Sequence, residues 1–315
     1  MSDQLHATEN PIGAMPWRFL KPRYWGVWFG MGLLWLLVFL PQRLRVVLGA
    51  RLGDIFYFLG KRVRRTAERN IELCFPDLEP LLKNDLVRRH FRAFGAVMLS
   101  VSLVWWVSVA RLHQLVRVRN REHYDRALAA GKNIILLAPH FLSLEVAGIL
   151  LGQERRMLSM YKQSNNDLVD WIIRRSRQRF GGTMIERGSH LKGMVRQIRA
   201  GHPFYYLPDQ NPGEAGHVFA PFFGVPAGTI TALSRIARLG DAVVIPCFTR
   251  LLPKGGGYEV IFHAPLENFP SGDDLADATQ MNAAIEAGVR EMPEQYMWTY
   301  KRFKQRPPGG PNLYG

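Results

Sequence analysis

The chain has 315 residues, of which 47% are hydrophobic, so it can form one large domain or two small ones with a substantial core. Its formal charge of +15 favours an anionic partner, which can be nucleic acid, an acidic membrane surface or a phosphorylated substrate. Its two cysteines, Cys74 and Cys247, are too few for a disulfide framework or a zinc cluster and are expected to be buried.

The first hydrophobic segment points to a membrane. Residues 1–23 are expected to form a short, poorly ordered lead, and residues 24–42 ("YWGVWFGMGLLWLLVFLPQ") carry no charge. As one helix, residues 24–42 would nearly cross the ~30 Å hydrocarbon core of a bilayer. The segment is slightly short, so an interfacial or re-entrant helix is the alternative. Positive charge is heavier after the segment than before it, which places the rest of the chain on the cytoplasmic side.

Helices are expected over residues 43–112. They include a strongly basic helix, "KRVRRTAERNIELCF", and a long apolar run that ends near residue 110. The apolar run could be a second membrane segment. Gly95, Ser100 and Ser102 within it favour a buried or bilayer-facing helix instead.

From Leu115 onward the pattern alternates between strands and helices. Strands are expected over residues 115–120, 133–140, 156–162, 183–188, 202–209, 242–252 and 258–264. The run "NIILLAPH" is apolar throughout, as in strands that are buried on both faces. Strands separated by helices indicate the α/β class, with a mostly parallel central sheet, flanking helices and a terminal hairpin.

One candidate catalytic pair follows the buried strand. His140 comes directly after that strand, and Glu145 lies in the first turn of a helix expected to begin at Ser143. Reactive groups in open α/β sheets gather at the carboxyl ends of the strands. A carboxylate that reaches back to the imidazole would fix its tautomer and stabilise its protonated form. The alternative is a structural histidine and a glutamate that complements the helix N-terminus.

Polar residues also follow two other strands. Arg187 could clamp a phosphate, and Asp209 and Gln210 could contribute to the same crevice. The aromatic stretch "FAPFFG" (residues 219–224) could line an acyl channel. The alternatives for each are a salt bridge, a turn or a core aromatic.

These segments together resemble a known family. "APHFLSLE", "ERG", "LPDQ" and "VVIPCF" follow the order of the four sequence blocks of the lysophospholipid acyltransferase superfamily. "RNIELCFPDL" and "PEQYMWTYKRFKQRP" resemble one branch, the late (secondary) acyltransferases of lipid A biosynthesis. The resemblance runs from about residue 24 to residue 308. It implies a glycerol-3-phosphate acyltransferase-like fold over residues 43–308, a membrane-anchoring helix over residues 24–42 and a tail over residues 309–315.

The resemblance also implies roles for individual residues. His140 would be the general base and Glu145 its orienting partner, while Arg187 would contact a lipid phosphate. Asp209 and Gln210 stand where many superfamily members have a glutamate and a glycine, and they would contribute to substrate binding. The chemistry requires no metal and no cofactor.

The implied reaction moves a fatty acyl chain from acyl carrier protein to a hydroxyl of a Kdo-bearing lipid A precursor. The expected partners are acyl carrier protein, an anionic glycolipid acceptor and the lipids of the bacterial inner membrane, and nucleic acid is not expected. Basic clusters at residues 174–179 and 301–306 would attract these anionic partners. The competing hypotheses are an acyltransferase for another lysolipid or aminolipid, a thioester or ester hydrolase, and a non-catalytic membrane-bound partner of envelope enzymes.

Overall fold

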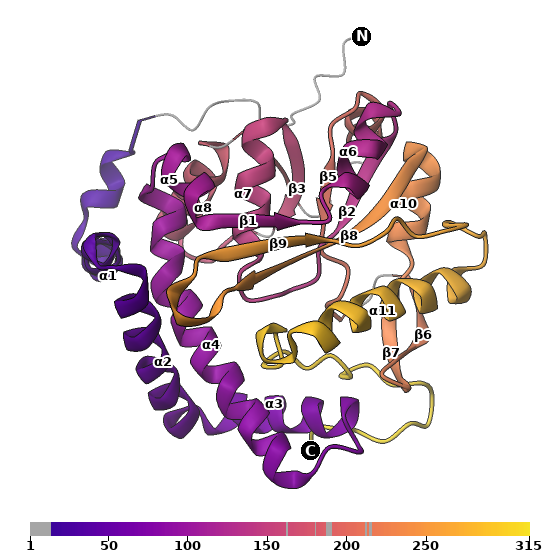
Figure 1. Ribbon diagram of the computed structural model, residues 1–315, viewed down its shortest axis with the longest axis horizontal. Helices are drawn as coiled ribbons and strands as arrows, with labels where there is room; N and C mark the ends of the chain where they lie inside the picture. The colour runs from indigo at the N-terminus through magenta and orange to yellow at the C-terminus, as the bar shows by residue number, and fades with distance from the viewer. Residues whose placement is uncertain (1–13, 162, 180, 187–190, 212, 214–215) are drawn as a thin grey trace.

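The structure is a computed structural model that describes residues 14–315, apart from residues 162, 180, 187–190, 212 and 214–215, and only the backbone of residues 101–105. A central seven-stranded sheet has the order β1-β9-β8-β2-β5-β3-β4 (Figure 1). Its strands are β1 (Val116–Arg119), β2 (Asn133–Leu137), β3 (Met157–Tyr161), β4 (Gly182–Glu186), β5 (Phe204–Tyr206), β8 (Ala242–Leu251) and β9 (Tyr258–Phe262). All neighbouring pairs are parallel except β8 and β9. This confirms the predicted α/β class, mostly parallel sheet and terminal hairpin.

Helices cover both faces of the sheet. The helices are α1 (Trp25–Leu36), α2 (Gln42–Leu59), α3 (Lys61–Cys74), α4 (Pro80–Trp106), α5 (Val109–Leu115), α6 (Glu122–Ala129), α7 (Leu144–Glu154), α8 (Asp167–Gln178), α9 (Leu191–Arg199), α10 (Ala232–Gly240) and α11 (Asp274–Glu291). One core contains residues of α3, α9, α10 and α11, and the other contains residues of α5, α6 and α7. The long helix α4 contributes to both cores.

Strand β2 shows why its sequence is apolar without alternation. Ile135 and Leu137 belong to one core, whereas Ile134 and Leu136 belong to the other. Successive side chains of a strand point to opposite faces, and here both faces are covered. The carboxyl end of β2 is therefore held rigidly from both sides, which matters because His140 follows it.

The predicted membrane-spanning helix over residues 24–42 is not present. Helix α1 ends at Leu36, a short 3-10 turn spans Leu37–Phe39, and α2 begins after Pro41. A proline disfavours the helical conformation in the residue before it, and Leu40 is extended here. Twelve residues of α-helix rise only about 18 Å. Within the described ranges, no helix combines the length and the apolar character needed to cross a bilayer, so the structure does not support the spanning prediction.

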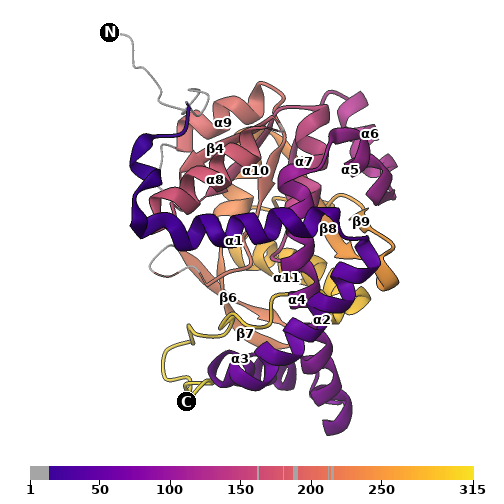
Figure 2. The same cartoon turned by 90° about the vertical axis from the view of Figure 1, so that its left-hand side faces the viewer.

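Helices α2 and α4 lie side by side and approach closely through glycines (Figure 2). A Cβ atom on Gly53 would collide with the carbonyl oxygen of Phe91 and come 2.7 Å from the Cα of Arg92. A Cβ on Gly95 would collide with the carbonyl oxygen of Gly49. The apolar run that was expected to be buried or bilayer-facing is thus partly covered by α2.

Replacing Gly53 with alanine is expected to lower the free energy of unfolding by about 1–3 kcal/mol, because the added methyl group forces α2 and α4 apart. The matched control is Gly30→Ala in α1, where a Cβ has no heavy atom within 4 Å. There, alanine should raise stability by up to about 1 kcal/mol through helix propensity. Urea unfolding of the full chain in detergent measures both changes. Equal effects at the two positions would contradict the close contact.

A second, two-stranded sheet was not predicted. Strands β6 (His217–Phe222) and β7 (Val225–Ile230) form an antiparallel hairpin whose turn holds Phe223 and Gly224 at positive φ. Pro221 and Pro226 face each other across it, and proline is tolerated in strands mainly at edges. Both strands of this small sheet are edge strands, so they can accommodate the prolines. In the sequence alone, the same prolines disfavour a strand.

Candidate active site

His140 lies in a short loop between β2 and α7. Strand β2 ends at Leu137, and α7 begins at Leu144 with Ser143 at the N-cap position, as expected from the sequence. The Ser143 side chain makes no capping hydrogen bond. The His140 side chain is 19% exposed, so the imidazole is mostly buried and still reachable from solvent.

The hydrogen-bonding partner of His140 is Asp209. The His140 ring Nδ1 lies 2.6 Å from Asp209 Oδ1, and the His140 backbone N–H donates to Asp209 Oδ2 at 2.9 Å. Strand β5, which precedes Asp209, pairs in parallel with β2, and Leu137 lies opposite Tyr206. His140 and Asp209 each follow these paired residues by three positions, so equal loop lengths bring the two side chains together.

The C-terminal segment completes this arrangement. Tyr296 donates its hydroxyl proton to Asp209 Oδ2 at 3.0 Å, and the backbone N–H of Met297 donates to the carbonyl oxygen of His140 at 3.0 Å. The Leu142 backbone N–H donates to the Gln295 carbonyl oxygen at 2.9 Å. The segment therefore holds both the loop that carries His140 and the carboxylate that orients it. Tyr296 was not predicted from the sequence, although it lies within the branch-specific stretch "PEQYMWTYKRFKQRP".

The electrostatics favour an ionised carboxylate beside the imidazole. Burial acts to raise the pKa of Asp209, but the charge and hydrogen bonds of His140, with a contribution from the charge of Arg302, hold this pKa below its ordinary value. Burial acts to lower the pKa of His140, but Asp209 and the charge of Glu145 raise it above its ordinary value. Burial and the Asp209 charge raise the pKa of Tyr296 well above its usual range, so Tyr296 stays protonated and donates.

This geometry selects the tautomer of His140. An ionised Asp209 accepts the Nδ1–H proton, so the neutral imidazole keeps a lone pair on Nε2. Asp209 was predicted to bind substrate. It instead lies beside the imidazole, in the position that was predicted for Glu145.

The Glu145 carboxylate instead pairs with Arg177 of α8. Arg177 Nε donates to Glu145 Oε2 at 3.1 Å, and Arg177 Nη2 donates to Glu145 Oε1. Both side chains line a cavity of about 70 Å³ between α7, α8 and the sheet. The expected hydrogen bond from the imidazole N–H to Glu145 is therefore replaced by an ion pair, although Glu145 remains close enough to raise the pKa of His140.

The other candidate residues have different outcomes. Arg187 lies outside the described residues. Gln210 follows Asp209 and is half-buried. Phe222 and Phe223 are buried in the core, where Phe223 contacts Phe75 at a ring-centroid separation of 5.0 Å.

The site therefore combines a buried carboxylate with an imidazole that has an available nitrogen, at the carboxyl edge of a parallel sheet. This arrangement is the one that general-base enzymes use. Comparison with known proteins identifies the family. A family model described as bacterial lipid A biosynthesis acyltransferase matches residues 14–305.

Curated relatives agree with this match over nearly their whole length. The chain is 38% identical to a lipid A biosynthesis acyltransferase of Haemophilus influenzae, over 93% of this chain and 92% of the relative. It is 34% identical to the lipid A biosynthesis lauroyltransferase of Escherichia coli, over 94% of this chain and 96% of the relative. It is 29% identical to the lipid A biosynthesis myristoyltransferase of Escherichia coli, over 92% and 90%.

The chain belongs to the bacterial lipid A biosynthesis acyltransferase family. It is an acyltransferase that acts in lipopolysaccharide biosynthesis, as its resemblance to the late acyltransferases implied.

Proposed function

We propose that the protein transfers a fatty acyl chain from acyl carrier protein to a hydroxyl of a Kdo-bearing lipid A precursor, with His140 as the general base. The observation that carries this proposal is the 2.6 Å contact between His140 Nδ1 and the buried Asp209 carboxylate. It leaves Nε2 as the proton acceptor and stabilises the imidazolium that forms when the proton is taken.

The proposed reaction needs no covalent enzyme intermediate. The acceptor hydroxyl gives its proton to His140 Nε2 while its oxygen attacks the thioester carbonyl carbon. A C–O bond forms as the C–S bond breaks, and the pantetheine thiolate takes the proton back from the imidazolium. A positioned histidine contributes about 10²–10⁴-fold to such a step.

The position of the chain at a membrane rests on its exposed apolar side chains. On α1, Phe29 is 77% exposed and Leu33 is 53% exposed, and on α2, Phe58 is 61% exposed and Leu59 is 78% exposed. Large apolar side chains that gather on an exposed surface are typical of membrane or partner contacts. They support the interfacial alternative, in which the protein lies on the cytoplasmic face of the bacterial inner membrane.

The basic clusters contribute unequally to binding anionic partners. Arg302 is only 3% exposed, donates to the carbonyl oxygen of Gly228 at 2.8 Å and lowers the pKa of Asp209, so it is a structural residue of the site. Arg177 is engaged with Glu145. Arg175 on α8, Arg179 directly after it and Lys304 near the C-terminus are exposed, and these are better placed to attract acidic head groups.

One assay tests the proposed reaction. Membranes that contain the protein are supplied with acyl carrier protein loaded with chains of several lengths and with a tetra-acylated, Kdo-bearing lipid A precursor. A mass gain of one acyl group in the precursor supports the proposal. Free fatty acid with an unmodified precursor would favour a hydrolase. Transfer only to another lysolipid or aminolipid would show that the acceptor is that lipid and not the lipid A precursor.

The role of Glu145 is tested through its pairing with Arg177. We expect Glu145→Gln and Arg177→Met each to lower kcat/KM by about 10-fold or more, because breaking this partly buried ion pair beside His140 leaves one charge without its partner. If Glu145 acts by holding Arg177, the double variant should be little worse than either single variant. Additive losses would instead indicate that Glu145 acts on His140 independently. The matched control is the exposed pair Arg89 and Asp85, where Asp85→Asn should leave kcat/KM unchanged.

A further inference from the structure

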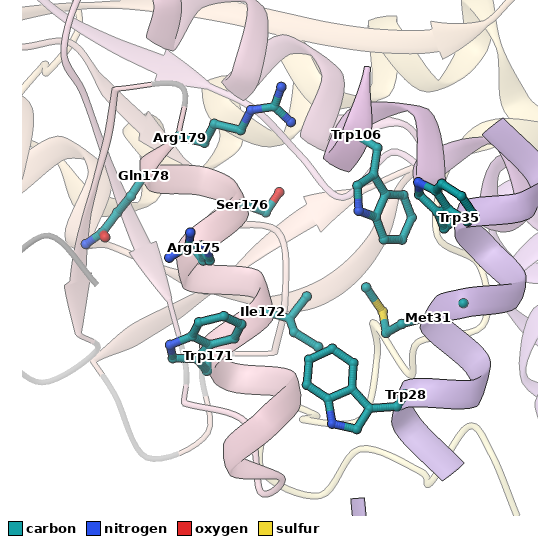
Figure 3. Close-up of a pocket in the computed structure, with 11 residues that line it drawn as sticks. Trp28, Met31, Trp35, Trp106, Trp171, Ile172, Arg175, Ser176, Gln178 and Arg179 are labelled. Atoms are coloured by element: carbon teal, nitrogen blue, oxygen red, sulfur yellow. The ribbon is translucent and has the colours of Figure 1, made fainter. Parts of the chain in front are cut away.

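A cavity of about 800 Å³ lies between α1, α8 and the end of α4 (Figure 3). Among the described side chains, four tryptophans line it, namely Trp28 and Trp35 of α1, Trp106 of α4 and Trp171 of α8. Among the described residues, its lining shares none with the smaller cavity beside Glu145. Its size is in the range of pockets that bind small organic molecules, and most of its wall is apolar.

The α8 side of the cavity is polar and basic. Arg175 and Arg179 line it together with Ser176, and no carboxylate is among the described lining residues. The Arg175 guanidinium lies over the Trp171 ring, 5.3 Å from its centroid. Ser176 is only 9% exposed, and among the described residues its hydroxyl has no hydrogen-bond partner. Buried polar atoms in native proteins are normally satisfied, so this hydroxyl indicates an acceptor that binds here.

The cavity is next to the apolar surface of α1. Trp25 and Phe29 on that helix are 63% and 77% exposed. Tryptophans are enriched where proteins meet the head-group region of a bilayer, because one end of the indole is apolar and the other donates a hydrogen bond. A ligand could therefore enter from a bilayer without crossing water.

We propose that this cavity binds an acidic glycerophospholipid of the bilayer. An acyl chain lies between the tryptophans, and a phosphate oxygen accepts hydrogen bonds from Ser176 and Arg175. Charge complementarity selects an anionic head group, since the described lining contains two guanidinium groups and no carboxylate. The bound lipid is not a substrate. It connects α1 to α8, the helix whose Arg177 binds Glu145.

Two glycines of α1 provide a matched test. A Cβ on Gly32 or on Gly30 has no heavy atom within 4 Å, so both positions accept a side chain, but only Gly32 lines the cavity. Native mass spectrometry of the full chain in detergent, with phosphatidylglycerol or phosphatidylcholine added, counts the retained lipids. Wild type should retain one phosphatidylglycerol, with about tenfold preference over phosphatidylcholine, because both lipids carry the same phosphodiester but the quaternary ammonium of phosphatidylcholine is repelled by the two guanidinium groups. Gly32→Phe should lose that lipid, Gly30→Phe should keep it, and Arg175→Gln should lose the preference.

Three results would overturn the proposal. They are equal retention of the two phospholipids by wild type, unchanged retention by Gly32→Phe, and preferential retention of an added lipid A precursor over phosphatidylglycerol. Lipid retention is measured without an acyl donor. Lipid retention can therefore be absent in a protein with normal acyl transfer. Conversely, a loss of acyl transfer would not change lipid retention.

Discussion

Replacing His140 with alanine is expected to lower kcat about 10²–10⁴-fold, because the acceptor hydroxyl then loses the group that takes its proton. The loss should appear in kcat more than in KM, since the imidazole acts on a proton that moves only during the reaction. Acylated precursor measured by mass spectrometry under single-turnover conditions gives the chemical step directly.

The structural cost of this change must be separated from the chemical cost. His140 is held by its backbone as well as by its ring, since its N–H donates to Asp209 and its carbonyl oxygen accepts from Met297. Those backbone bonds survive the substitution, so the loop should keep its conformation and circular dichroism should be unchanged. His113→Ala, at an exposed histidine of α5, is the control and should leave kcat unchanged. A His140→Ala protein that retains wild-type kcat would disprove the general-base role.

The position of the site could be predicted from the sequence because it depends on local patterns. An apolar run without alternation identified β2, and the abrupt change at Pro139 and His140 marked its carboxyl end. Polar residues after a second strand placed Asp209 at the same edge of the sheet. Both expectations followed from the general location of sites in parallel sheets.

The partner of His140 could not be predicted in the same way. Glu145 is five residues from His140, so local geometry favoured it, whereas Asp209 is 69 residues away. Choosing Asp209 requires knowing that β5 lies next to β2 although β3 and β4 come between them in the chain. It also requires knowing that Arg177, from α8, engages the Glu145 carboxylate. Long-range pairings of this kind are not encoded in spacing.

The prediction of one continuous helix over residues 24–42 is not supported, for a different reason. Counting uncharged residues from Tyr24 to Gln42 treated the segment as one helix, although Pro41 lies within it. The exposed apolar side chains of α1 and α2 show that the hydrophobicity was real and that only its arrangement was misjudged. The same surface borders the cavity between α1 and α8.

The His140–Asp209 pair also affects stability over a defined pH range. The pKa of His140 is raised above its ordinary 6.5, so its contribution is present below that value and is lost as the pH rises through the raised pKa. The pKa of Asp209 is lowered below its ordinary 3.8, so its contribution is present above that value and is lost as the pH falls through the lowered pKa. Both contributions are therefore present together between about pH 4 and 6.5.

Replacing Asp209 with asparagine is expected to lower kcat about 10²–10⁴-fold, because the amide neither fixes the Nδ1–H tautomer nor stabilises the imidazolium.

The same substitution should also move the acidic limb of the profile of kcat/KM against pH. A general base must be neutral, so kcat/KM falls as the pH drops through the pKa of His140, which lies above 6.5 in the wild type. Without the aspartate charge, burial dominates and lowers that pKa, so the limb of the variant should move to lower pH. Glu145→Gln removes a smaller contribution and should move the limb in the same direction by less. A limb that stays in place in Asp209→Asn would show that the titration belongs to another group, whereas a shift with a reduced plateau is the signature of a base oriented by Asp209.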